Sequence, residues 1–92
     1  MIADLSSLTI GALTLTPAFD ADVTEYTVET SNATNKVTAV AADENATIQI
    51  LNGETEIENG SSASWETGEN TLTINVTNGS AEKTYTVTVT KS

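Results

Sequence analysis

Threonine alternates with apolar residues along much of the chain, and this alternation constrains the fold more than any other feature of the sequence. It is clearest over residues 83–90, where threonines separate Tyr85, Val87 and Val89. Successive side chains of a β-strand point to opposite faces, so such a stretch has one apolar and one polar face. Threonine is β-branched and polar, which suits the wet face of a strand. Because long helical patterns are absent, the sequence predicts an all-β protein.

The stretch from residue 13 onward indicates how the chain passes between two sheets. Residues 13–16 alternate leucine with threonine and predict a short strand, which resumes a first strand interrupted near Gly11. Pro17 has no N–H for a strand ladder, so we expect it to end this strand at a corner. Phe19 then places an apolar ring over the core, and the alternation resumes on a strand over residues 25–30.

Turn-forming residues recur about every 8–12 residues and divide the remainder of the chain into short strands. Asn52-Gly53 predicts a type I′ hairpin, because both residues tolerate the positive φ that this turn requires. Alternating glutamates over residues 54–58 protect an exposed sheet edge. We therefore expect one domain over residues 1–92, an immunoglobulin-like β-sandwich of about seven or eight mostly antiparallel strands. Further strands are expected over residues 36–42, 46–51, 61–65, 71–77 and 83–90.

The aromatic residues are few, namely one Trp, two Tyr and one Phe, and we expect all of them in the core. Trp65 has an alternative role as a platform for a ligand, but the alternation gives it an inward position. A sugar-binding sandwich needs a large aromatic ring outside the core, and this assignment leaves none. The residues expected to be mostly buried are Phe19, Tyr26, Trp65, Leu72, Ile74, Tyr85 and Val87.

The chain is strongly acidic, with 3 basic and 13 acidic residues and a formal net charge of −10. Proteins that bind nucleic acids or anionic membranes use Lys and Arg to replace counterions, so we expect neither kind of partner. The acidity itself favours solubility. No stretch approaches the roughly 20 apolar residues of a membrane helix, so we expect no membrane insertion.

The sequence offers little for catalysis or metal binding. It has no Cys and no His, which excludes thiol nucleophiles and histidine bases. Its carboxylates lie in predicted turns or on an exposed edge, so we expect no enzyme, no catalytic residue and no cofactor. Asp20, Asp22 and Glu25 are the best candidates for a weak calcium site. Asp20 is more simply explained as an acceptor for N–H groups of its own turn, so we assign no metal site.

Several motifs of the chain occur together in one known family. The most specific is Pro17-Ala18-Phe19-Asp20, followed by Tyr26 six residues after the aspartate. With the motifs below, it makes the chain similar to the cadherin-like β-sandwich domains of bacterial surface proteins, over nearly its whole length. The other matching motifs are Leu13-x-Leu15, Val23-Thr24-x-Tyr26-Thr27-Val28, Ala46-Thr47-Ile48 before Asn52-Gly53, residues 68–77 and residues 83–90.

The resemblance implies an immunoglobulin-like module, usually repeated within large exported proteins beside adhesive, enzymatic or carbohydrate-binding domains. It implies no catalytic or binding residue, and the calcium motifs of true cadherins, Asp-Arg-Glu and Asp-x-Asn-Asp-Asn, are absent here. Similar domains also decorate phage tails and capsids. Residues 1–5 show no basic segment or apolar core of a signal peptide, which fits a domain of a longer exported protein or a virion protein.

These observations predict a non-catalytic spacer or assembly module of an exported bacterial surface protein or a phage virion. The expected location is extracellular, on the cell surface, or in the virion. The expected partners are neighbouring domains of a longer polypeptide or assembly, with a surface protein or a glycan as further candidates. The alternative is an adhesion module that binds carbohydrate or a host protein through loops at the poles, such as Asn32–Asn35 or Asn78–Ser80.

Overall fold

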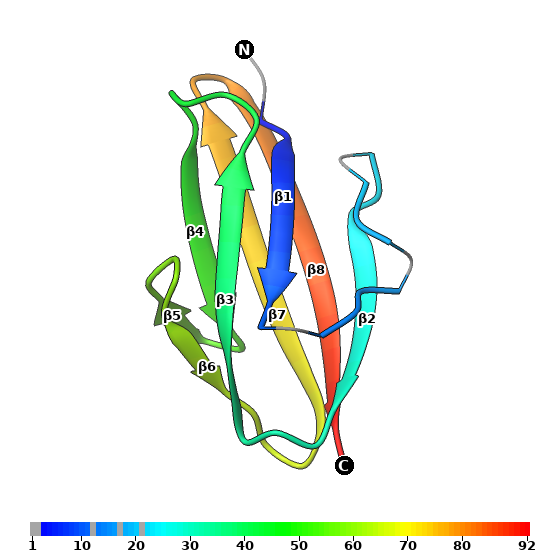
Figure 1. Ribbon diagram of the computed structural model, residues 1–92. Coiled ribbons are helices and arrows are strands. Elements are labelled where there is room, and N and C mark those ends of the chain that lie inside the picture. Colours follow the sequence, from blue (N-terminus) through cyan, green and yellow to red (C-terminus); the bar gives the residue numbers. More distant parts are fainter. Residues whose placement is uncertain (1–2, 12, 17, 21) are drawn as a thin grey trace.

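The computed structural model describes residues 3–11, 13–16, 18–20 and 22–92, and these residues form eight strands in two packed sheets without a helix (Figure 1). One sheet has the order β1-β3-β6 and the other β2-β8-β7-β4-β5. Paired strands run antiparallel except β2 and β8, which are parallel. The predicted all-β sandwich is therefore confirmed. The strands are β1 (Leu5–Ile10), β2 (Glu25–Thr30), β3 (Thr34–Ala41), β4 (Thr47–Asn52), β5 (Thr55–Ile57), β6 (Ser62–Ser64), β7 (Gly68–Asn78) and β8 (Ala81–Lys91).

The core lies between the two sheets and follows the alternation of the sequence. Every second side chain is buried from Leu72 to Asn78 on β7 and from Tyr85 to Val89 on β8, and threonines occupy most positions of the opposite face. Phe19 is only partly buried, and its ring covers the core with centroids 5.9 Å from Tyr26 and 6.4 Å from Tyr85. The expected core residues that are buried are Tyr26, Trp65, Leu72, Ile74, Tyr85 and Val87.

The connection from β1 to β2 carries the chain from one sheet to the other, as predicted, but its described residues form no second piece of strand. Gly11 has a φ of 56° and the Leu13 N–H donates to the Ile10 oxygen, so the chain turns away from β1. Within residues 13–16 only Thr16 pairs with a strand, through bonds of 3.0 and 2.8 Å with Thr27. The predicted strand over residues 13–16 is therefore wrong. Pro17, expected at the corner, lies outside the described residues.

The hairpin predicted at Asn52-Gly53 is present, but the turn is shifted by one residue. Asn52 still belongs to β4 and pairs with Thr55, so the loop residues are Gly53 and Glu54. Gly53 has a φ of 64°, whereas no described non-glycine residue has a positive φ. Positive φ at the first loop position alone fits a type II′ turn instead of the predicted type I′. The shift arises because Gly53 N–H donates to the Thr71 oxygen, which extends the pairing of β4 with β7.

The molecule is elongated, with principal extents of 39 × 25 × 17 Å. We call the end that holds residues 42–46 and 79–80 the upper pole, and the end that holds residues 31–33 and 65–67 the lower pole (Figure 1). β1 and β8 both run from the upper to the lower pole, so β1 begins at one end of the long axis and β8 finishes at the other. The described part of the chain contains no helix with the length and hydrophobicity that a membrane crossing requires.

Candidate functional site

Hydrogen bonds within the chain hold the loops of the upper pole. Asp43 lies between β3 and β4, and its two carboxylate oxygens accept bonds from Asn78 Nδ2 at 3.0 Å and from the Asn45 N–H at 2.9 Å. Asn78 is buried, and its carboxamide ties the end of β7 to the loop between β3 and β4. Of the candidate loop Asn78–Ser80, only Gly79 and Ser80 are exposed.

Just below the upper pole, polar contacts join the first strand to the last across the sandwich. Lys83 Nζ lies 3.0 Å from Asp4 Oδ1 and 5.5 Å from the centroid of the Tyr85 ring. The hydrogen bond to Asp4 holds the pKa of Lys83 above its usual value. Leu5 N–H donates to the hydroxyl oxygen of the buried Tyr85 at 3.1 Å. These contacts fix the start of β1 against β8.

At the lower pole, Trp65 anchors the structure. It is 5% exposed, its backbone N–H donates to the Ala33 oxygen, and its Nε1 donates to Asn35 Oδ1 at 2.9 Å. Gly11 packs against the same asparagine, because a Cβ at Gly11 would lie 2.8 Å from Asn35 Nδ2. The prediction of Trp65 as a core residue is confirmed, and Asn35 of the candidate loop Asn32–Asn35 serves to hold it.

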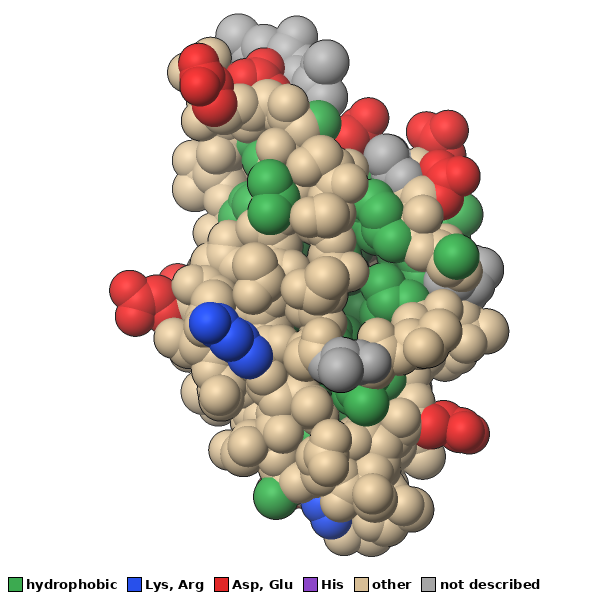
Figure 2. Space-filling model, in the orientation of Figure 1, with side chains coloured by type: hydrophobic (Ala, Val, Ile, Leu, Met, Phe, Trp, Pro, Cys, Tyr) green, Lys and Arg blue, Asp and Glu red, His purple; other side chains and the backbone are tan. Residues whose placement is uncertain are grey.

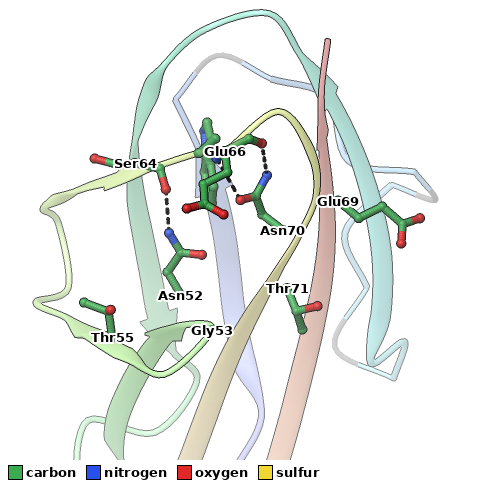
Figure 3. A pocket seen from close by; sticks show the side chains of 9 residues that line it. Asn52, Gly53, Thr55, Ser64, Glu66, Glu69, Asn70 and Thr71 are labelled. Atoms are coloured by element: carbon green, nitrogen blue, oxygen red, sulfur yellow. Dashed lines mark hydrogen bonds between the residues drawn. The ribbon is translucent and has the colours of Figure 1, made fainter.

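A hollow of about 470 Å³ opens beside Trp65, between the β4–β5 turn and the start of β7 (Figure 3). Its amide side chains are used within the chain. Asn52 Nδ2 donates to the Ser64 oxygen at 2.7 Å, and the Asn70 side chain both accepts from the N–H and donates to the oxygen of Glu66. The bond from Asn52 links the five-stranded sheet to the three-stranded sheet. The amide groups of the hollow therefore hold the two sheets together at the edge where β4 lies near β6.

Two carboxylates also line this hollow, a pairing that the sequence did not suggest. Glu66 and Glu69 are both exposed, and the side chain of Glu69 points away from the hollow in Figure 3. They do not face each other across a closed cleft of the kind that acid–base pairs use. The indole of Trp65 is buried, so it presents no open face on which a sugar ring could stack.

The acidic turn before β2 is organised around Asp20. Its Oδ1 accepts a bond from the Asp22 N–H at 2.9 Å, as expected for an aspartate in its own turn. The Tyr26 hydroxyl donates to the Asp20 backbone oxygen at 2.6 Å and accepts from the Asp20 N–H at 2.9 Å. Among the residues that the structure describes, no group of three His, Cys, Asp or Glu side chains could hold a metal ion, and Asp20, Asp22 and Glu25 form no such group.

Charge is unevenly spread over the face that carries β1 and β3. Figure 2 shows this face covered mainly by neutral side chains, with acidic groups gathered around its margin. Lys36 and Val40 are exposed on β3, and Val40 is 47% exposed. The remaining outward residues of this sheet are small hydroxyl-bearing side chains. Among the described residues, this face therefore has low charge.

Comparison with known protein families gives a match over nearly the whole chain. A family model described as cadherin-like beta sandwich domain matches residues 5–92, which includes every strand from β1 to β8. A search of curated proteins finds no relative at a significant level of similarity.

Proposed function

Because the chain belongs to the cadherin-like β-sandwich domain family, we propose that it is a non-catalytic spacer or assembly module that holds neighbouring domains apart. Domains of this family are structural or binding modules and are typically extracellular. Our proposal is narrower and places the chain in an exported bacterial surface protein or a phage virion. Its partners are then the neighbouring domains of the same polypeptide or assembly.

The opposite positions of the first and last strands carry this proposal. β1 starts at the upper pole and β8 ends at the lower pole, along an axis of 39 Å (Figure 1). Domains attached before and after the sandwich would therefore lie at opposite ends of a short rod. The loops at both poles support the proposal as well, because Asp43 and Asn78 brace one pole and Trp65 and Asn35 brace the other.

The alternative is an adhesion module that binds a glycan or a host protein near the lower pole. The hollow between Asn52 and Glu66 favours it, together with the exposed residues 31–34. Against it, both side-chain amides of the hollow are engaged within the chain, and Trp65 is buried. We therefore favour the spacer.

Titration of the ¹⁵N-labelled chain with plant, host and cell-wall glycans distinguishes the two functions. The spacer predicts no saturable shift of amide resonances at any pole. Saturable shifts gathered around Asn52 and Glu66, and lost in an Asn52→Ala variant that still folds, would favour the adhesion module. The matched control is Gln49→Ala, because Gln49 is exposed on the same strand outside the hollow.

A further inference from the structure

The direction of β1 and β8 determines how a pull along the long axis enters the sandwich. A pull on the two ends of the chain draws β1 toward the upper pole and β8 toward the lower pole (Figure 1). The hydrogen bonds of an antiparallel ladder are perpendicular to the strands. Each terminal strand is therefore loaded in shear, with all bonds of its ladder strained together, instead of being unzipped one bond at a time.

The two terminal strands are not equally anchored. Among the described strands, β1 is an edge strand that pairs with β3 alone, from Leu5–Ala41 to Ile10–Val37, and a bulge interrupts its ladder between Leu5 and Ser7. β8 lies inside its sheet and pairs along its whole length with β7 and over six positions with β2. The weaker attachment is thus at β1, even with the contact of Leu5 to Tyr85 and that of the preceding Asp4 to Lys83.

The chain beyond β1 has a second set of anchors. Thr16 exchanges two backbone hydrogen bonds with Thr27 on β2. A few residues later, the Tyr26 hydroxyl holds the N–H and the oxygen of Asp20, and the Phe19 ring stacks on Tyr26. After a pull has removed β1 from β3, the bonds of Thr16 and Asp20 to β2 must therefore break before the chain can extend further.

We propose that the sandwich yields to force in two steps, in which β1 leaves β3 first and the anchors on β2 then hold the remaining strands. This inference rests on the proposed spacer function, because a spacer within a longer polypeptide transmits pull between its neighbours. The first step frees residues 3–15, which span at most roughly 45 Å when fully extended. The molecule thus lengthens by the release of β1 before its remaining strands unfold.

Single-molecule force spectroscopy on a polyprotein of whole chains tests the order. We expect a short extension, within the limit set by residues 3–15, before the main rupture. The diagnostic variant joins β1 to β3 through Thr9→Cys and Thr38→Cys, because these residues lie directly opposite each other and the chain has no other cysteine. Opposite residues of an antiparallel pair have Cα atoms about 4.5–5.5 Å apart, which a disulfide can bridge.

In the oxidised variant the short step should disappear, and reduction should restore it in the same molecules. Ser7→Cys with Val40→Cys is a second staple on the same ladder, available if the first variant does not fold. The matched control is Thr47→Cys with Thr77→Cys, which joins β4 to β7. This control should keep the short step and shorten the main one.

Three results would overturn the inference: a short step that survives oxidation of the β1 staple, a wild-type chain that ruptures in one step, or a short step altered by the control staple. Tyr26→Phe should leave the length of the first step unchanged and reduce the lifetime of the intermediate. An unchanged lifetime would show that the Tyr26 hydroxyl is not an anchor. Glycan titration bears on the spacer function and not on the order of rupture, so the two proposals can fail separately.

Discussion

The Tyr26 hydroxyl binds both backbone groups of Asp20, donating to its oxygen at 2.6 Å and accepting from its N–H at 2.9 Å. Tyr26 follows Asp20 by six positions along the chain. One side chain of β2 thus fixes the segment by which the chain arrives from the other sheet. This contact explains the tyrosine at position 26, whereas the aspartate at position 20 is explained by its own side chain, which accepts the Asp22 N–H.

Removing this hydroxyl tests the connection. Tyr26→Phe keeps the ring in the core and its stacking on Phe19, but leaves both Asp20 backbone groups without this partner. We expect a loss of about 1–2 kcal/mol in the free energy of unfolding, in the range for losing hydrogen bonds to partly buried groups. Urea denaturation measures it. Stability equal to that of the wild type would show that water replaces the hydroxyl without cost.

A paired glycine experiment tests the packing of Gly11 against Asn35. Gly11 and Gly53 have similar φ values of 56° and 64°, but a Cβ would meet Asn35 only at Gly11. Left-handed backbone costs a non-glycine residue about 1–2 kcal/mol. We expect Gly53→Ala to lose about this amount and Gly11→Ala to lose more, because its Cβ also displaces the partner of Trp65. Equal losses in the two variants would show that Asn35 moves aside freely.

Truncation of the two large aromatic rings should have unequal effects. Trp65 is buried and hydrogen-bonded, so Trp65→Ala should cost about 3–5 kcal/mol, as for other buried aromatic residues. Phe19 is only partly buried and covers the core from outside, so Phe19→Ala should cost less. Thermal and chemical denaturation of both variants measures the difference. A larger loss for Phe19→Ala would mean that the corner, and not the lower pole, is the more tightly packed region.

The contact between Lys83 and Asp4 predicts a change in stability at alkaline pH. Its hydrogen bond raises the pKa of Lys83, so folding favours the charged lysine. The resulting gain in the free energy of unfolding is complete below the unfolded pKa of about 10.4. It is lost as the pH rises through the higher pKa of Lys83 in the folded state. The side chains are 24% and 40% exposed, so we expect its size to be below about 1 kcal/mol.

The measurement compares the melting temperatures of the wild type and Lys83→Met from neutral pH to a pH above the pKa of Lys83. Their difference should be constant at neutral pH and shrink as Lys83 loses its proton. Lys36→Met is the matched control, since Lys36 is exposed on the three-stranded sheet. A difference that grows with pH would contradict the assigned direction of the pKa.

The net charge of −10 predicts that salt stabilises the chain. Repulsion among its acidic groups weakens the compact state at low ionic strength, and screening shortens to about 8 Å at physiological ionic strength. We expect moderate NaCl to raise the melting temperature, and calcium to add nothing beyond its ionic strength. A saturable calcium effect that is lost in Asp22→Asn would revive a site at Asp20, Asp22 and Glu25.

Much of the fold could be predicted because alternation is a local property. β2 has the predicted bounds, Glu25–Thr30, and the final strand differs from its prediction only by extra residues at each end. The strand predicted over residues 13–16 failed for a non-local reason. Its leucines alternate correctly, but the turn at Gly11 directs the segment away from β1, and Thr16 is the residue of this segment whose backbone pairs with β2.

The polar connections could not be predicted, because they join residues far apart in the sequence. Lys83 and Asp4 are 79 residues apart, and Asn78 and Asp43 are 35 apart. The Asn59 side chain illustrates the same limit. It exchanges hydrogen bonds with both backbone groups of Ala39 on β3 and so continues the pairing of β3 beyond the short strand β6. The sequence shows Asn59 only as part of a turn. The candidate loops lie at the poles, but Asn35 belongs to β3 and Asn78 to β7, and the contacts that these two side chains make were not visible in the sequence.

The central claim, that the chain is a spacer, is tested most directly by small-angle X-ray scattering of two copies in one polypeptide, with Ser92 of the first joined to Ala3 of the second. Because β1 starts and β8 ends at opposite poles, the pair should be extended, with a largest dimension close to twice the 39 Å of one copy. A compact particle in which the copies pack side by side, with a largest dimension near that of one copy, would contradict the spacer function.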